Sequence, residues 1–109
     1  MFLSPTHLDV TTTGAAHGTV RVAAVGEIDM GSAPRLHRAV LDALVGRPAV
    51  VEVDLAGVTF MDSSGINILV ACRQGAGDAR VRVVNAAPQV LRVLTVTGLA
   101  AVLGLSPAG

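Results

Sequence analysis

Residues 49–77 read AVVEVDLAGVTFMDSSGINILVACRQGAG, and this stretch decides the fold because it contains a strand and a helix in succession. Residues 49–55 (AVVEVDL) predict a buried strand, since they are rich in valine and have too few polar positions for a surface hairpin. Further on, a helix can begin at Asp62 or Ser63, which are preferred capping residues, and continue to about Gln74. The stretch therefore predicts a strand–helix unit of an α/β sheet.

The chain before this unit predicts two strands and a helix. Residues 8–10 alternate apolar and polar side chains, which indicates a short edge strand, and residues 19–26 (TVRVAAVG) indicate a strand that ends at its last glycine. The apolar positions of residues 36–44 recur at helical spacing. We therefore expect a helix with Ser32 as its cap and Gly46 at its end.

The chain after the unit predicts one more strand and one more helix. The valine-rich residues 81–84 indicate a short strand, and residues 88–97 indicate a helix that ends at Gly98. Residues 99–105 predict a last helical turn, and residues 106–109 predict a frayed tail.

The predicted order of elements defines the fold class. Strand, strand, helix, strand, helix, strand and helix predict a small α/β sandwich: a four- to five-stranded mixed sheet with an antiparallel N-terminal edge strand and helices mainly on one face. Functional groups in such sheets gather where strands end and helices begin. That edge comprises residues 26–31 and 59–65, so we expect functional residues in these two loops.

Composition limits both the size and the partners of the protein. A chain of 109 residues is expected to form one domain, and its 51% hydrophobic content excludes a disordered chain. Eight arginines balance eight acidic residues, and only two residues are aromatic, which argues against direct binding of nucleic acid. The charge is uneven, because residues 1–72 contain four arginines and seven acids, whereas residues 73–109 contain four arginines and one acid.

The sequence also bears on location. The longest unbroken apolar runs, residues 68–72 and 99–103, have five residues, whereas a membrane-spanning helix needs about 20. No secretory leader is predicted. A single cysteine, Cys72, suits a reducing compartment and is expected to be a small core residue. We therefore expect a cytoplasmic protein without membrane insertion.

Several enzymatic sites are excluded by the residues present. Asp54 follows the pattern of a phospho-accepting aspartate of a receiver domain, but the chain has no lysine, so a strand-terminal polar residue is expected instead. A phosphate-binding loop is excluded for the same reason. Ser63 or Ser64 would need a nearby base as a hydrolytic nucleophile, yet the surrounding residues do not fit the G-x-S-x-G elbow. Histidines, cysteine and carboxylates show no ligand spacing, so we expect no metal, no cofactor and no enzyme activity.

The DSSG sequence at residues 62–65 has two interpretations. As a helix start it needs no function, because aspartate and serine accept hydrogen bonds from unpaired backbone N–H groups. However, the large apolar residues Phe60 and Met61 precede it, and a serine in a first helical turn lies at the positive end of the helix dipole. A phosphate there gains favourable interactions without breaking the helix, which suits a reversible switch.

Three blocks of sequence resemble the STAS domain of bacterial anti-sigma factor antagonists over about residues 8–105. They are GEID at residues 26–29, FMDSSG at residues 60–65, and NAAPQV at residues 85–90, which leads to Leu94 and to TGL at residues 97–99. The resemblance implies a single STAS domain over residues 1–109. It also implies partner switching: the antagonist binds an anti-sigma factor that is also a serine kinase, is released when phosphorylated, and is restored by a PP2C-type phosphatase.

The resemblance assigns roles to individual residues. It implies phosphorylation of Ser64 and places the following residues around the phosphosite or in the partner-binding surface: Asp29, Met30, Phe60, Met61, Asp62, Ser63 and Gly65. Asp29 could instead be only a turn or cap residue, and Phe60 could belong to the core. Asn67 stands where the family often has glycine, which bears on the fit to a particular kinase.

The functional alternative is a STAS scaffold or transport-complex subunit that is never phosphorylated. In either case we expect a monomer or a weak dimer.

Overall fold

In the part of the chain that the structure describes, four strands and three helices follow one another in the predicted order. The computed structural model describes residues 8–14, 17–96 and 98. The elements are β1 (Leu8–Gly14), β2 (Thr19–Ile28), α1 (Ala33–Val45), β3 (Val50–Met61), α2 (Ser63–Gln74), β4 (Arg80–Val84) and α3 (Pro88–Val96). The predictions for residues 99–105 and 106–109 lie outside the described residues.

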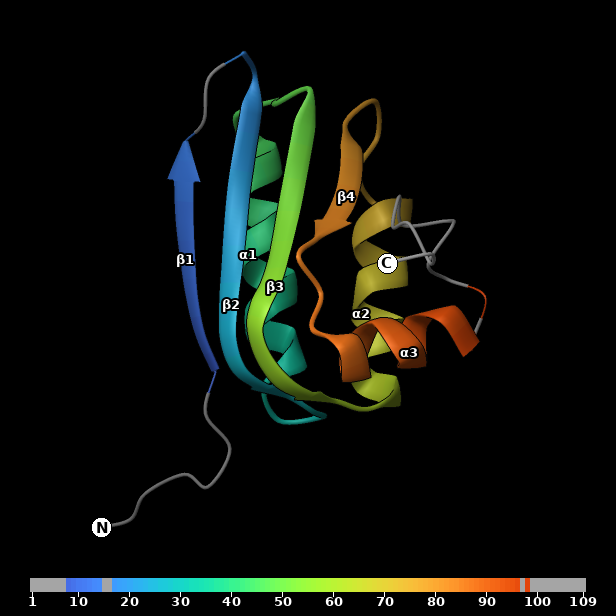
Figure 1. Cartoon of the computed structure of the whole chain (residues 1–109). Helices are drawn as coiled ribbons and strands as arrows, with labels where there is room; N and C mark the ends of the chain where they lie inside the picture. The colour runs from blue at the N-terminus through green and yellow to red at the C-terminus, as the bar shows by residue number, and fades with distance from the viewer. Residues whose placement is uncertain (1–7, 15–16, 97, 99–109) are drawn as a thin grey trace, which may run out of the picture.

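The strands form one mixed sheet in the order β1-β2-β3-β4. β1 pairs antiparallel with β2, and the other neighbouring pairs are parallel. α1 and α2 contact each other and lie behind the sheet in Figure 1, while α3 contacts β3 below the end of the short strand β4. The mixed sheet with its antiparallel edge strand confirms the predicted fold class.

The core lies between the sheet and the helices. Alternate residues of the central strands point into it, including Val22, Ala24, Val51, Val53 and Leu55, and they pack against Leu36, Val40, Leu69 and Cys72 of the helices. Cys72 is fully buried, as expected. None of the described helices is long and apolar enough to cross a membrane.

Both central strands extend further than predicted. β2 was predicted to end at Gly26, but it continues to Ile28 across a register shift. Gly26 permits this irregularity because it has φ of +126°, a conformation that other residues rarely adopt. Residues 59–61 were expected to lie in a loop, and the strand was expected to end near residue 55, yet β3 continues and pairs with β2 as far as Met61. Phe60 and Met61 therefore lie on a strand and not in a loop.

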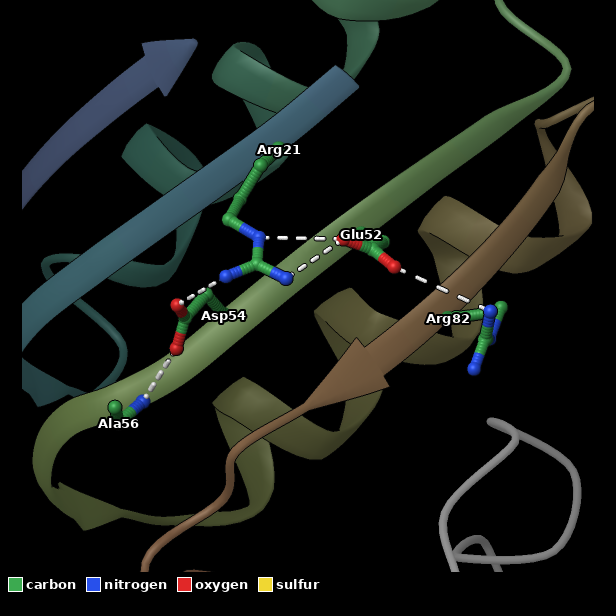
Figure 2. A network of polar contacts seen from close by, with 5 residues as sticks. All are labelled: Arg21, Glu52, Asp54, Ala56 and Arg82. Carbon is green, nitrogen blue, oxygen red and sulfur yellow. Dashed lines mark hydrogen bonds and ion pairs between the residues drawn. The ribbon is translucent and has the colours of Figure 1, made fainter. Parts of the chain in front are cut away.

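The sheet face opposite α1 and α2 carries a network of charged side chains (Figure 2). Arg21 on β2 donates to Glu52 at 2.8 Å and to Asp54 at 3.3 Å, both on β3. Arg82 on β4 lies 4.0 Å from the other Glu52 oxygen. The hydrogen bond to Glu52 and the charges of both carboxylates raise the pKa of Arg21 above its ordinary value. Asp54 was predicted to end its strand, and this prediction is wrong. It lies within β3 and accepts a hydrogen bond from Arg21.

Candidate functional site

The two predicted loops meet at one edge of the sheet because β2 and β3 run parallel and end together. Ile28 is the register partner of Met61, and the backbone N–H of Asp62 donates to the Ile28 carbonyl at 3.2 Å. This hydrogen bond joins the exits of the two strands. It brings the segment that begins at Asp29 beside the segment that begins at Asp62.

The first segment is held by Asp29 and Ser32. One carboxylate oxygen of Asp29 accepts hydrogen bonds from the backbone N–H groups of Gly31 at 2.9 Å and Ser32 at 3.0 Å. The Ser32 hydroxyl donates to the Glu27 carbonyl at 2.7 Å and accepts from the Asp29 N–H at 3.0 Å. Asp29 therefore acts as a turn residue, since its carboxylate holds the backbone of the second and third residues that follow it.

Ser32 lies at the predicted N-cap position of α1, but its side chain does not cap that helix. Instead the residue is only 6% exposed, and its hydroxyl bridges the end of β2 to the turn. The sequence carried one usable signal for this, namely the Asp-x-x-Ser spacing, in which aspartate and serine can satisfy each other's backbone groups.

The second segment is the start of α2. Asp62 is its N-cap, in extended conformation, and its carboxylate accepts a hydrogen bond from the Ser64 N–H at 2.8 Å. Ser63 and Ser64 are thus the first two helical residues. Ser63 is exposed and Ser64 is half-buried. Within the described residues, the Ser64 hydroxyl has no hydrogen-bond partner.

Gly65 allows the start of α2 to sit directly on the sheet. A Cβ atom at this position would lie 2.6 Å from Cγ of Met61 and 2.9 Å from Cγ2 of Ile28. Real Cβ atoms essentially never approach other atoms so closely. The glycine therefore fixes the distance between the helix N-terminus and the ends of both strands, and with it the position of the adjacent Ser64.

The three apolar residues assigned to a docking surface are not equally available. Met30 is 79% exposed and Phe60 is 48% exposed, so both can contact a partner. Met61 is only 6% exposed because its side chain packs under Gly65 and belongs to the core. We therefore correct the expectation for Met61, which supports the site from below and offers almost no surface.

This edge of the molecule is acidic. Glu27 is exposed, and Asp29 and Asp62 are half-buried. Residues 26–34 and 55–72 contain no arginine, lysine or histidine. The next arginine along the chain, Arg35, donates to the Leu8 carbonyl at 2.8 Å. No group of three or more potential metal-ligating side chains occurs in the described part of the chain.

The fold and this edge define a STAS-type α/β domain, and comparison with known families agrees. A family model described as "Mlab, STAS domain" matches residues 11–105. The chain belongs to the STAS domain family.

Two known proteins are similar to this chain. The chain is 34% identical over 71 residues to "Anti-sigma-F factor antagonist RsfB" of Mycobacterium tuberculosis, a match that covers 64% of this chain and 58% of that protein. It is 30% identical to the crystal structure of an anti-sigma factor antagonist from Mycobacterium paratuberculosis, with a TM-score of 0.86 and coverage of 97% and 91% of the two chains.

A more distant structure shares the fold. Unphosphorylated SpoIIAA, described as an anti-sigma factor antagonist, superposes with a TM-score of 0.73 at 20% identity over 85% of this chain and 84% of that one.

Proposed function

We propose that this protein is an anti-sigma factor antagonist that acts by partner switching. In its unphosphorylated form it binds an anti-sigma factor that is also a serine kinase, and so frees the sigma factor for transcription. Phosphorylation of Ser64 releases the antagonist, and a PP2C-type phosphatase restores it. In this role the chain is a regulator and not an enzyme, acts in the cytoplasm, and uses residues 1–109 as a single STAS domain.

The observation that carries this proposal is the geometry of Ser64. Its backbone N–H is held by Asp62 at 2.8 Å, while its hydroxyl has no hydrogen-bond partner among the described residues. The backbone is thus fixed and the hydroxyl oxygen is left for phosphoryl transfer. The two mycobacterial relatives described above are named as anti-sigma factor antagonists, which supports the same role for this chain.

A phosphate on Ser64 would leave the fold intact and change the surface. The helix N-terminus favours negative charge through its dipole and its free N–H groups. The phosphate would nevertheless add about 1.5 to 2 negative charges to an edge that already carries Glu27, Asp29 and Asp62. A partner that docks on Met30 and Phe60 would meet this charge directly. We infer that release follows from electrostatic and steric rejection, without refolding.

The direct test is phosphorylation by the cognate kinase with ATP, followed by intact-mass measurement. We expect one added phosphate on the wild-type protein, none on Ser64→Ala, and one on the matched control Ser63→Ala. Ser63 is the appropriate control because it precedes Ser64 on the same helical turn and is more exposed. Absence of phosphate on the wild-type protein, or its persistence on Ser64→Ala, would contradict the proposal and favour the non-switching scaffold or transport-complex subunit.

A further inference from the structure

We propose that β1 is a self-association edge, through which two copies of this chain pair antiparallel and join their sheets. The proposal concerns the side of the sheet formed by β1 and does not depend on Ser64. It rests on the contrast between the two edges of the sheet and on the sequence of β1.

Within the described residues, most of the β1 edge lacks the features that normally prevent strands from pairing with other molecules; the exceptions are Asp9 and the Leu8 carbonyl, which accepts from Arg35. β1 is the outer strand in Figure 1, and all seven of its residues pair with β2 without a register shift. Its sequence, LDVTTTG, contains no proline, no basic residue and a single acid, and residues 11–14 are exposed. Proteins usually protect such edges with bulges, prolines, charges or very short strands.

The opposite edge is protected in these ways. β4 has only five residues, and its exposed side chains include Arg80 and Arg82. The residue that follows it, Asn85, has φ of +59°, which interrupts an extended conformation. Within the described residues, these protective features occur along β4 and are missing along most of β1, which favours pairing through β1.

The sequence of β1 is complementary to itself. A two-fold axis through Thr11 places Asp9 of each copy opposite Thr13 of the other, so the single charge of the strand does not face its equivalent. Thr11 then faces Thr11, and threonine pairs across antiparallel strands are favourable. Such a contact is isologous, which is the commonest symmetry of small oligomers.

This geometry also limits the strength of the contact and its effect on the site. Two paired strands bury less than the roughly 1,200–2,000 Å² of stable interfaces, so the dimer is weak and depends on concentration. The antiparallel arrangement joins two four-stranded sheets and places the two Ser64 edges at opposite ends. The surface around Ser64 of each copy therefore stays available to a partner protein.

Sedimentation velocity from micromolar to millimolar concentration tests the proposal. We expect the wild-type protein to shift from monomer to dimer, and Thr11→Lys to stay monomeric because the two lysines face each other. The matched control Thr95→Lys makes the same charge change on exposed α3 and should dimerise like the wild type. A mixture of Thr11→Lys and Thr11→Glu should dimerise again, since the facing charges are now opposite.

The rescue by the mixture separates a lost contact from a damaged fold, because two misfolded variants would not restore each other. A wild-type protein that stays monomeric at millimolar concentration overturns the proposal. So does a dimer that survives Thr11→Lys, since that dimer must use another surface, such as exposed Leu41 and Val45 on α1. Phosphorylation of Ser64 should be the same in all these variants, so this test and that of the proposed function fail independently.

Discussion

The carboxylate of Asp62 accepts a hydrogen bond from the backbone N–H of Ser64 at 2.8 Å, and this bond both starts α2 and positions the proposed phosphorylation site. A structural role and a functional role thus coincide in the same residues. This explains why the sequence alone could not separate a simple helix cap from a regulatory serine. The two roles can be separated by substitutions at Asp62 that keep the capping hydrogen bond and remove the charge, and by substitutions that remove the hydrogen bond.

Asp62→Ala should lower the free energy of unfolding by about 1 kcal/mol, because it removes the side chain that satisfies an unpaired N–H of the first turn. Asp62→Asn keeps an accepting oxygen and should stay within about 0.5 kcal/mol of the wild type. Urea denaturation of the three proteins measures both changes. An equal loss in the two variants would show that the charge of Asp62, and not its cap, stabilises the fold.

Gly65→Ala should destabilise the protein by about 1–3 kcal/mol, since the new methyl group would overlap the side chains of Met61 and Ile28. Helix propensity alone predicts the opposite sign, because alanine is a better helix former than glycine. Gly14→Ala is the control, since nothing lies within 4 Å of its Cβ position. Thermal and urea denaturation decide between packing and propensity, and a stabilised Gly65→Ala protein would refute the packing role.

Ser32→Ala should cost about 1–3 kcal/mol, because it removes the buried hydroxyl that donates to the Glu27 carbonyl and accepts from the Asp29 N–H. The exposed Ser63→Ala variant should remain within about 0.5 kcal/mol of the wild type. Hydrogen exchange of the Asp29 amide provides a local readout that should accelerate only in Ser32→Ala. Unchanged exchange there would mean that the hydroxyl does not hold the turn.

Cys72 should make stability depend on pH in the alkaline range. Burial raises the pKa of its thiol to about 11, so between the unfolded pKa of about 8.5 and this value the folded state binds more protons. The free energy of unfolding should therefore be at its full value below about pH 8.5 and fall as the pH rises towards 11. The chain has no lysine and no tyrosine, which leaves this range almost free of other titrating groups.

Urea denaturation from pH 8 to 11 measures the slope, and Cys72→Ala is the control that should remove it. Thiol reagents should also react with Cys72 only after unfolding, because it is fully buried. If the free energy of unfolding of the wild-type and Cys72→Ala proteins depended equally on pH, the titration of Cys72 could not be its cause.

The helices and the order of elements could be predicted because they depend on local patterns, such as the apolar spacing of α1 and the glycines after α2. The ends of β2 and β3 could not, because Gly26 and Gly57 look like strand breakers in sequence. Pairing between the two strands carries both glycines through the sheet. The Arg21–Glu52–Asp54 network was also missed, since its members lie 31 to 33 positions apart.

The candidate site was predicted in outline, and its supporting contacts were not. The sequence placed Asp29 and Asp62 at a common edge, because parallel strands end together. It could not show that Met61 is buried beneath Gly65, or that Ser32 bridges to Glu27, because both depend on how α1 and α2 sit on the strand ends.

The most direct test of the central claim is the dissociation constant of the cognate anti-sigma factor for the unphosphorylated protein and for the protein phosphorylated on Ser64, measured by titration calorimetry. We predict binding at least about tenfold weaker after phosphorylation, a change of about 1.4 kcal/mol, with Ser64→Ala binding like the unphosphorylated form. Equal dissociation constants for the two forms would contradict the account.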